Sequence, residues 1–163
     1  MPTIPRRVVP LVAALVVLTA CDEDNVFPTT PSVPQADAAA ALTRAIQSEY
    51  RAENIYLRVL VDFGSVEPFE SIAYSEPRHS ATLAYLFVAR DLAVPASEWT
   101  LNNVQTYDSV EDACAAAAAV EQDNIAMYDE LLALNLPDDV LQAFGDNRAS
   151  SEDDRLPAFE ACG

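Results

Sequence analysis

Two residues with metal-binding chemistry, Glu76 and His79, lie three positions apart, and His79 is the single histidine of the chain. The surrounding pattern is helical and amphipathic, so the two side chains fall on one helix face. Ile72, Leu83 and Phe87 share that face, which directs it toward a core. Because burying a carboxylate or an imidazole without a partner is costly, the pair needs one, and a metal ion can serve.

The helices that must position these residues can be read from the spacing of apolar side chains. This spacing predicts four helices, at about residues 36–62, 67–91, 109–134 and 138–161. Gly64 ends the first, and Pro68 suits the first turn of the second. Ser109 and Asp112, three residues apart, suit the start of the third. The fourth is expected to kink or break near Gly145.

The connections between these segments are short, long and short in turn. This order predicts an all-α fold, a ferritin-like four-helix bundle with a long crossover between the second and third helices. An up-down-up-down bundle with a floppy second loop is the alternative. The composition agrees with helices, since 3 glycines and many alanines favour helix over a turn-rich β fold.

A two-metal carboxylate site in such a bundle takes one Glu from each of two helices and Glu-x-x-His from each of the other two. The first three helices offer four candidate metal ligands: Glu49, Glu76, His79 and Glu121. The last helix offers Glu152 and, three residues later, Arg155 in the place of a histidine. Iron and manganese accept carboxylate oxygens together with imidazole, so these are the metals expected.

Three strings of the sequence extend this pattern over about residues 38–159. They are Glu49-x-x-Ala52-x-x-x-Tyr56, Phe69-Glu70-Ser71-Ile72-Ala73-x-Ser75-Glu76-x-x-His79 and Leu156-Pro157-Ala158-Phe159. With them the chain resembles a family of ferritin-like bacterial proteins known as a domain of unknown function. The resemblance implies that Glu49, Glu76, His79 and Glu121 are metal ligands. It also implies that Arg155 stands where this family usually has a histidine.

Arg155 limits what the expected site can do. A guanidinium donates hydrogen bonds only and cannot ligate a cation, but it can pair with Glu121 or Glu49 and replace the charge of one metal ion. Two outcomes are open: one ion on the Glu76 and His79 side, or no metal and a polar network in the core. We therefore expect one ion at most. Ferroxidase or peroxidase chemistry is not favoured, and a metal-free helical module for partner binding or a structural role is the alternative.

The first 36 residues read as targeting and tether segments. Arg6 and Arg7 precede an apolar run at 8–18, which is short for a membrane span. The run ends in Leu-Thr-Ala before Cys21, which resembles a bacterial lipobox. We expect a signal peptide at 1–20, lipidation of Cys21, an acidic Pro/Thr-rich tether at 21–36 and the bundle at 37–163, in an exported lipoprotein of the cell envelope. An ordinary signal peptide that ends near a cysteine is the alternative.

Charge and cysteine content complete the sequence-based picture. The chain has 26 acidic residues against 9 arginines and a net charge of −17, which disfavours binding to nucleic acid. The membrane is expected as a partner only through the lipid on Cys21. Cys114 and Cys162 remain, and an even pair in an exported domain indicates a disulfide. Two free buried thiols are the alternative.

Overall fold

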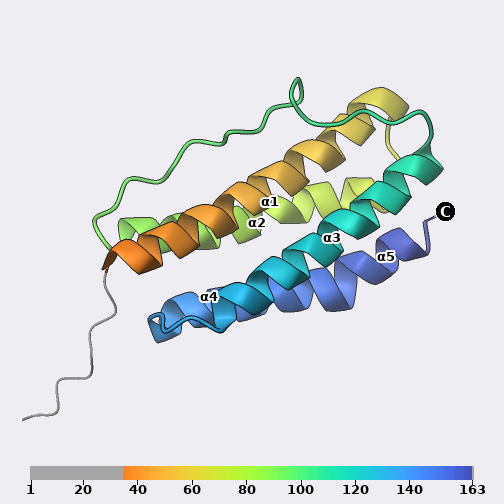
Figure 1. Ribbon diagram of the computed structural model, residues 1–163. Helices are drawn as coiled ribbons and strands as arrows, with labels where there is room; N and C mark the ends of the chain where they lie inside the picture. Colours follow the sequence, from red (N-terminus) through yellow and green to blue (C-terminus); the bar gives the residue numbers. More distant parts are fainter. Residues whose placement is uncertain (1–34, 163) are drawn as a thin grey trace, which may run out of the picture. The chain divides into compact units, whose positions relative to one another are not determined.

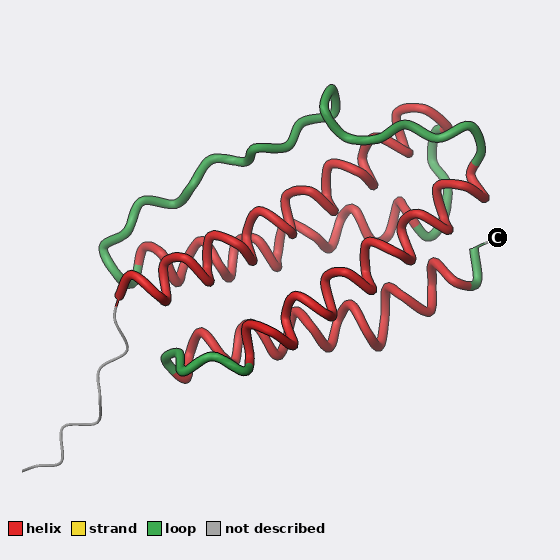
Figure 2. The backbone as a smooth tube through the Cα atoms, in the orientation of Figure 1, coloured by secondary structure: helices red, strands yellow, loops and turns green. Residues whose placement is uncertain are grey.

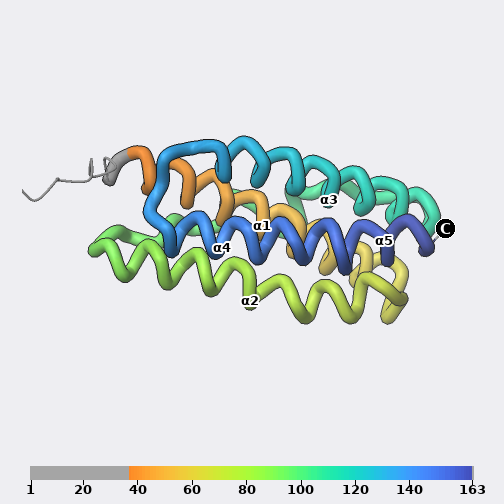
Figure 3. Tube along the Cα trace, turned by 90° about the horizontal axis from the view of Figure 1, so that it is seen from below, coloured from red at the N-terminus to blue at the C-terminus, as the bar shows by residue number. Residues whose placement is uncertain are grey.

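The computed structural model describes residues 35–162, which form an all-helical fold without strands. Its elements are α1 (Gln35–Phe63), α2 (Phe69–Val88), α3 (Val110–Leu132), α4 (Asp138–Ala149), the π-helical turn η1 (Ser150–Arg155) and α5 (Leu156–Glu160). Figures 1 and 3 show that α4, η1 and α5 form one continuous column, so the bundle has four helical columns. The prediction of an all-α four-helix bundle is confirmed.

Several expected features fall at the N-terminus, outside the described residues. These are the signal peptide at 1–20, the lipidation site Cys21 and the tether at 21–36 up to its last two residues. Of the expected domain at 37–163, all residues but Gly163 are described. None of the helices between residues 35 and 162 has the combination of length and apolar character that crossing a membrane requires.

The connections differ greatly in length. Gly64, with a φ of 81°, ends α1 and starts the short turn to α2. Figures 1 and 2 show the connection at 89–109 running back along the bundle beside α1, so that α3 points the same way as α2. This connection is fastened to α1, because the Gln47 side chain donates to Ala96 O (2.7 Å) and accepts from Glu98 N (3.0 Å).

The apolar core consists of two clusters, one toward each end of the bundle. The first contains Leu42, Ile46, Leu83, Tyr128, Val140 and Phe144. The second contains Ile55, Tyr56, Phe69, Ala113, Ala117 and Phe159. Burial of each large side chain contributes about 1.5–3 kcal/mol to folding. The clusters therefore hold the helices firmly on both sides of the segment between them.

The fourth column differs from its sequence-based prediction. It does not break at Gly145, which lies inside α4, but widens into a π-helical turn at η1. From Asn147 onward, the buried residues of this column recur every fourth position: Asn147, Ser151, Arg155 and Phe159. In a regular α-helix four residues turn about 40° beyond a full turn, so such a row would drift away from the core. The wider turn takes up this drift and keeps the row facing inward.

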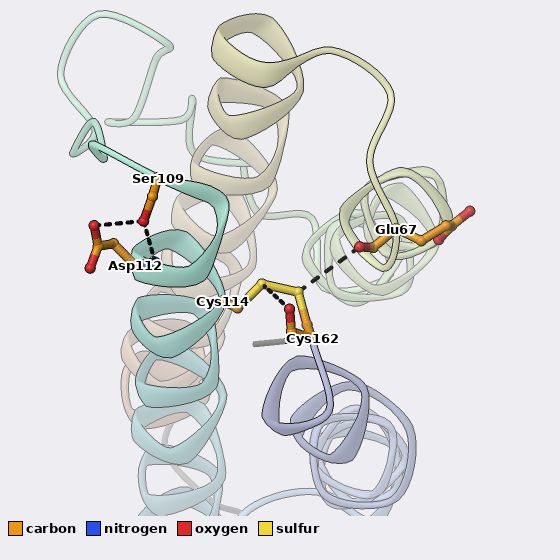
Figure 4. Close-up of a disulfide and its surroundings, with 5 residues drawn as sticks. All are labelled: Glu67, Ser109, Asp112, Cys114 and Cys162. Atoms are coloured by element: carbon orange, nitrogen blue, oxygen red, sulfur yellow. Dashed lines mark hydrogen bonds between the residues drawn. A yellow bond between two sulfur atoms is a disulfide. The ribbon is translucent and has the colours of Figure 1, made fainter.

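A disulfide joins the start of α3 to the end of the chain. Cys114 and Cys162 are bonded, as expected, with Cα atoms 5.8 Å apart and 48 positions apart in the sequence. Figure 4 shows the bond between the two helices, together with the start of α3. There Ser109 accepts a hydrogen bond from Asp112 N (3.0 Å) and caps the helix as predicted.

Candidate metal centre

Three carboxylates from three helices meet between the two apolar clusters. Glu49 on α1, Glu76 on α2 and Glu121 on α3 are each 0% exposed, and Arg155 of η1 is 1% exposed. Nη1 of Arg155 lies 3.7 Å from Oε2 of Glu49 and 3.2 Å from Oε1 of Glu76. It also lies 3.6 Å from Oε2 of Glu121. The residues that the sequence singled out therefore converge, and Arg155 points into the core.

The apolar stripe of each helix carries its carboxylate into this position. On α1, Glu49 lies three residues after Ile46 and three before Ala52, and both neighbours are buried. On α3, Glu121 lies four residues after the buried Ala117. Because residues three and four apart share a helix face, packing of the apolar neighbours turns the carboxylates into the core.

His79 stands at the edge of the cluster, with 19% of its side chain exposed. Its Nδ1 lies 3.9 Å from Oε2 of Glu49 and 3.7 Å from Oε2 of Glu76. Nη2 of Arg155 contacts the same nitrogen. Ligand atoms of Glu49, Glu76 and His79 all lie within 4.8 Å of one another, so this group could hold a metal ion.

Two tyrosines hold the carboxylates in place by a reciprocal arrangement. The Tyr128 hydroxyl on α3 donates to Oε1 of Glu49 on α1, and the Tyr56 hydroxyl on α1 donates to Oε1 of Glu121 on α3. Asn147 of α4 adds a second donor to Glu49 at 3.2 Å. Each tyrosine follows the Glu of its own helix by seven residues, which returns it to the same face.

Sequence analysis missed these supporting residues. Tyr56 and Tyr128 are both 0% exposed. The repeated spacing of Glu, six residues and Tyr in α1 and α3 is the signal that could have identified them. Asn147 carries a weaker signal, since it begins the four-residue row that ends in the inward-facing part of η1.

The position of Glu152 corrects an expectation. It was expected next to the site, but it is exposed and pairs with Arg148 on the surface of the fourth column. Glu152 lies three residues before Arg155, and the π-helical turn takes more residues per turn than an α-helix. The two side chains therefore do not share a face, and Glu152 supplies no oxygen to the cluster.

Four carboxylate oxygens of the cluster lack hydrogen-bond partners among the described residues. They are Oε2 of Glu49, both oxygens of Glu76 and Oε2 of Glu121. Nη1 of Arg155 also lacks a hydrogen bond, so its contacts with these oxygens are ion pairs without hydrogen-bond alignment. Buried oxygens of this kind are costly unless a cation or proton meets them.

The same crowding alters the acidity of the cluster. Burial raises the pKa of Glu49 to about 8, and the charge of Glu76 adds to this rise while Arg155 opposes it. Burial also raises the pKa of Glu76 to about 7, against the opposing charge of Arg155. Burial, and then the charge of Arg155, lower the pKa of His79, which favours the neutral ring that binds metals.

Charge counting indicates how many cations the cluster can accept. When all three carboxylates are ionised, as metal ligation requires, they carry three negative charges against the one positive charge of Arg155, which leaves two negative charges. One divalent ion neutralises them. We infer that Arg155 takes the place of a second ion, because its Nη1 already lies among all three carboxylates and a guanidinium cannot itself ligate a metal.

Comparison with known proteins supports the fold and gives no information about the chemistry of the site. No protein-family profile and no curated protein sequence matches this chain. Among solved structures, the chain is similar to the crystal structure of a hypothetical protein from Methanococcus jannaschii DSM 2661. The TM-score is 0.68, the sequence identity is 18%, and the match covers 82% of each chain. At this identity the similarity supports the fold alone.

Proposed function

We propose that this protein binds one divalent transition-metal ion, iron or manganese, through Glu49, Glu76 and His79 in a ferritin-like bundle. The observation that carries the proposal is the set of buried carboxylate oxygens without hydrogen-bond partners among residues 35–162. Oxygen ligands capped by an imidazole suit these two metals. Glu121 then serves mainly as the counter-charge of Arg155.

Arg155 restricts the proposed site to a single ion. It supplies permanently the positive charge that a second metal would bring, and its raised pKa, held up by the surrounding carboxylates against the cost of burial, keeps it charged. Two-metal oxidation chemistry is therefore not part of the proposal.

When bound, a single iron or manganese ion supplies Lewis acidity and one-electron chemistry. The chain's own residues orient the ligands and limit access to them. Tyr128 and Asn147 fix one oxygen of Glu49, which leaves the other free to bind. The apolar clusters exclude water on both sides, and the partly exposed edge at His79 offers the shortest path from solvent.

Elemental analysis of protein purified without an affinity tag tests this proposal. We expect about one equivalent of iron or manganese per chain, and loss of that metal in Glu49→Gln and Glu76→Gln. Glu111→Gln changes an exposed carboxylate of α3 and is the matched control. Wild-type protein that binds neither metal after reconstitution with Fe(II) or Mn(II) would contradict the proposal.

The competing proposal is a metal-free helical module for partner binding or a structural role. One contact favours it: Nη2 of Arg155 engages Nδ1 of His79, the nitrogen that faces the carboxylates. In that case Arg155 is the only cation that the cluster needs. The same metal analysis separates the two proposals, because the module predicts a folded protein without stoichiometric metal.

We also propose that the mature protein is exported and held at a membrane of the bacterial cell envelope by lipid on Cys21. The support comes from the charged, apolar and Cys-terminated order of residues 6–21. The disulfide of the bundle is consistent with an oxidising compartment. No nucleic-acid partner is proposed, given the net charge of −17.

A further inference from the structure

A cavity of about 290 Å³ lies on the other side of α1 and α3 from the carboxylate cluster. Ile55 and Val120 form part of its floor, and their sequence neighbours Tyr56 and Glu121 face the cluster instead. The wall comes from the connection at 89–109, which Figure 1 shows running beside α1. The cavity is therefore separate from the proposed metal site.

The cavity contains an arginine that has no acidic partner. Within the described part of the chain, Arg51 makes no ion pair, whereas Arg44 and Arg58 on the same helix each bind a carboxylate. The Arg51 guanidinium instead lies 5.6 Å from the centroid of the Trp99 ring. In a chain with 26 acidic residues against 9 arginines, an arginine left without a carboxylate is available to a ligand.

The wall segment that carries Trp99 is preorganised by hydrogen bonds of its own. Trp99 N donates to Oγ of Ser97 (3.1 Å), and the Asn103 side chain donates to Glu98 O (2.8 Å) and accepts from Thr100 N (2.6 Å). The hydrogen bonds of the Gln47 side chain on α1 with Ala96 and Glu98 fix the start of the same segment. A ligand would therefore meet an ordered aromatic surface and would lose little affinity to loop ordering.

The remaining lining adds one acidic group and one phenol. Asp123 of α3 also lines the cavity, and no ion pair between described residues joins it to Arg51. Burial raises the pKa of Tyr107, and the nearby charge of Arg51 opposes that rise, which places the guanidinium close to the phenol. The cavity thus presents separate positive and negative groups beside apolar and aromatic surface.

We propose that this cavity binds a small zwitterion of the α-amino-acid type. The ligand carboxylate pairs with Arg51, and its ammonium group faces Asp123. An apolar side chain lies against Trp99 and the floor formed by Ile55 and Val120. A simple anion would be repelled by Asp123 and a simple cation by Arg51, so the pair of opposite charges selects a ligand that carries both.

Trp99 is the only tryptophan of the chain, so intrinsic fluorescence reports directly on this cavity. The full chain is titrated with glycine, L-leucine and L-phenylalanine, which span a range of side-chain sizes, and isothermal calorimetry confirms each fluorescence change. We expect saturable binding that is strongest for a probe with an apolar side chain. Absence of a saturable signal with all three probes would overturn the proposal.

Analogues of one probe separate the two charges. N-acetyl-L-leucine lacks the ammonium group and L-leucinamide lacks the carboxylate, and we expect each to bind at least about tenfold more weakly than L-leucine. If N-acetyl-L-leucine binds as tightly as L-leucine, the cavity is a plain anion site and the zwitterion proposal is wrong.

Two variants assign the charges to residues. Arg51→Gln should weaken L-leucine binding at least about tenfold, and Asp123→Asn should abolish the preference for L-leucine over N-acetyl-L-leucine. Arg58→Gln on the same helix removes an arginine that pairs with Asp62 and serves as the control. Equal weakening by Arg51→Gln and Arg58→Gln would contradict a site at Arg51. Because these residues lie outside the metal cluster, the result does not depend on metal content.

Discussion

Arg155 places a permanent positive charge among three buried carboxylates, which a metal ion could otherwise neutralise. Its Nη1 lies 3.2–3.7 Å from three buried carboxylates, and its Nη2 contacts His79. Removing one partner from such a buried charge cluster leaves the others uncompensated, which is costly. The number of ions bound and the protonation of the carboxylates should therefore both respond to changes at this one residue.

The first prediction concerns metal stoichiometry. Arg155→His removes the fixed charge and introduces an imidazole, so it should raise bound iron or manganese above the one ion per chain that we propose, toward two. His79→Ala removes a ligand and should weaken binding by about tenfold or more, since even partners beyond the direct ligands change metal affinity 10–100-fold. Elemental analysis after reconstitution and dialysis measures both.

Arg148→His is the matched control for this experiment. Arg148 lies on the same helical column but pairs with Asp129 and Glu152 at the surface. Its replacement should leave stoichiometry unchanged. If Arg155→His binds no more metal than the parent and His79→Ala binds no less, the pair on α2 is a polar core contact and the metal-free module becomes the better proposal.

The second prediction is that the metal-free protein loses stability as pH rises from about 6.5 to 8.5. Glu49 and Glu76 keep their protons in the folded state up to pKa values of about 8 and about 7, against an ordinary value of 4.5. In this window the folded chain binds more protons than the unfolded chain, so the free energy of unfolding falls. Each retained proton contributes a slope of about 1.4 kcal/mol per pH unit.

Urea unfolding of chelator-treated protein across this range measures the slope. The double variant Glu49→Gln/Glu76→Gln should flatten it, because neither amide titrates. Added Mn(II) should oppose the trend, since metal binding requires deprotonated ligands and strengthens with pH. A metal-free protein that grows more stable from pH 6.5 to 8.5 would show that other groups dominate.

At the scale of elements, the disulfide and the π-helical turn together fix the end of the fourth column. The bond between Cys114 and Cys162 holds the end of α5 against α3, next to Phe159, which is 1% exposed. The turn at η1 then fixes the rotation of the column that presents Arg155. Loosening the C-terminus should therefore weaken the packing of Phe159 and the position of Arg155 in the core.

The third prediction follows from this connection. Reduction of the disulfide, which closes a loop of 48 residues, should lower the free energy of unfolding by about 2–4 kcal/mol. Urea unfolding with and without reductant measures the loss, and a Cys114→Ser/Cys162→Ser variant should be insensitive to reductant. Free thiols in non-reduced peptide maps of the purified protein would contradict the pairing.

The sequence predicted the helices well where local signals are strong. Apolar spacing located all four columns, Gly64 ended α1 and Ser109 capped α3. The second helix ends at Val88 and not near Asp91, because the chain turns there and Asp91 takes a φ of 56°. The sequence did not predict the π-helical turn, because the turn follows from packing of the whole column and no single residue type indicates it.

The candidate site divides in the same way. The structure shows that Arg155 points inward, which the sequence left open. Residue spacing did pick out all three carboxylates, which are buried. It could not identify which side chains meet across helices, because that depends on how α1 and α3 are placed against each other. The hydrogen bonds from Tyr56 and Tyr128 to the opposite helix belong to this second class.

The chain carries a net charge of −17, and the buried charged residues of its bundle lie between two apolar clusters. Membrane attachment is proposed here only through Cys21. A lipid on Cys21 would provide it, since each buried methylene contributes about 0.8 kcal/mol and only a multiply acylated cysteine anchors firmly.

The fourth prediction tests that anchor in the full-length protein. Cys21→Ser removes the only side chain that a lipobox can lipidate, so it should either release the chain from the membrane fraction or block its processing. Fractionation and intact mass spectrometry of the expressed protein measure both outcomes. Cys114→Ser changes a cysteine of the bundle and should leave membrane attachment unchanged. The Cys21→Ser protein could instead stay in the membrane fraction and differ in mass from the parent only by the exchange of sulfur for oxygen. In that case the parent carries no lipid at this position. The apolar run at 8–18 would then be the remaining candidate for attachment.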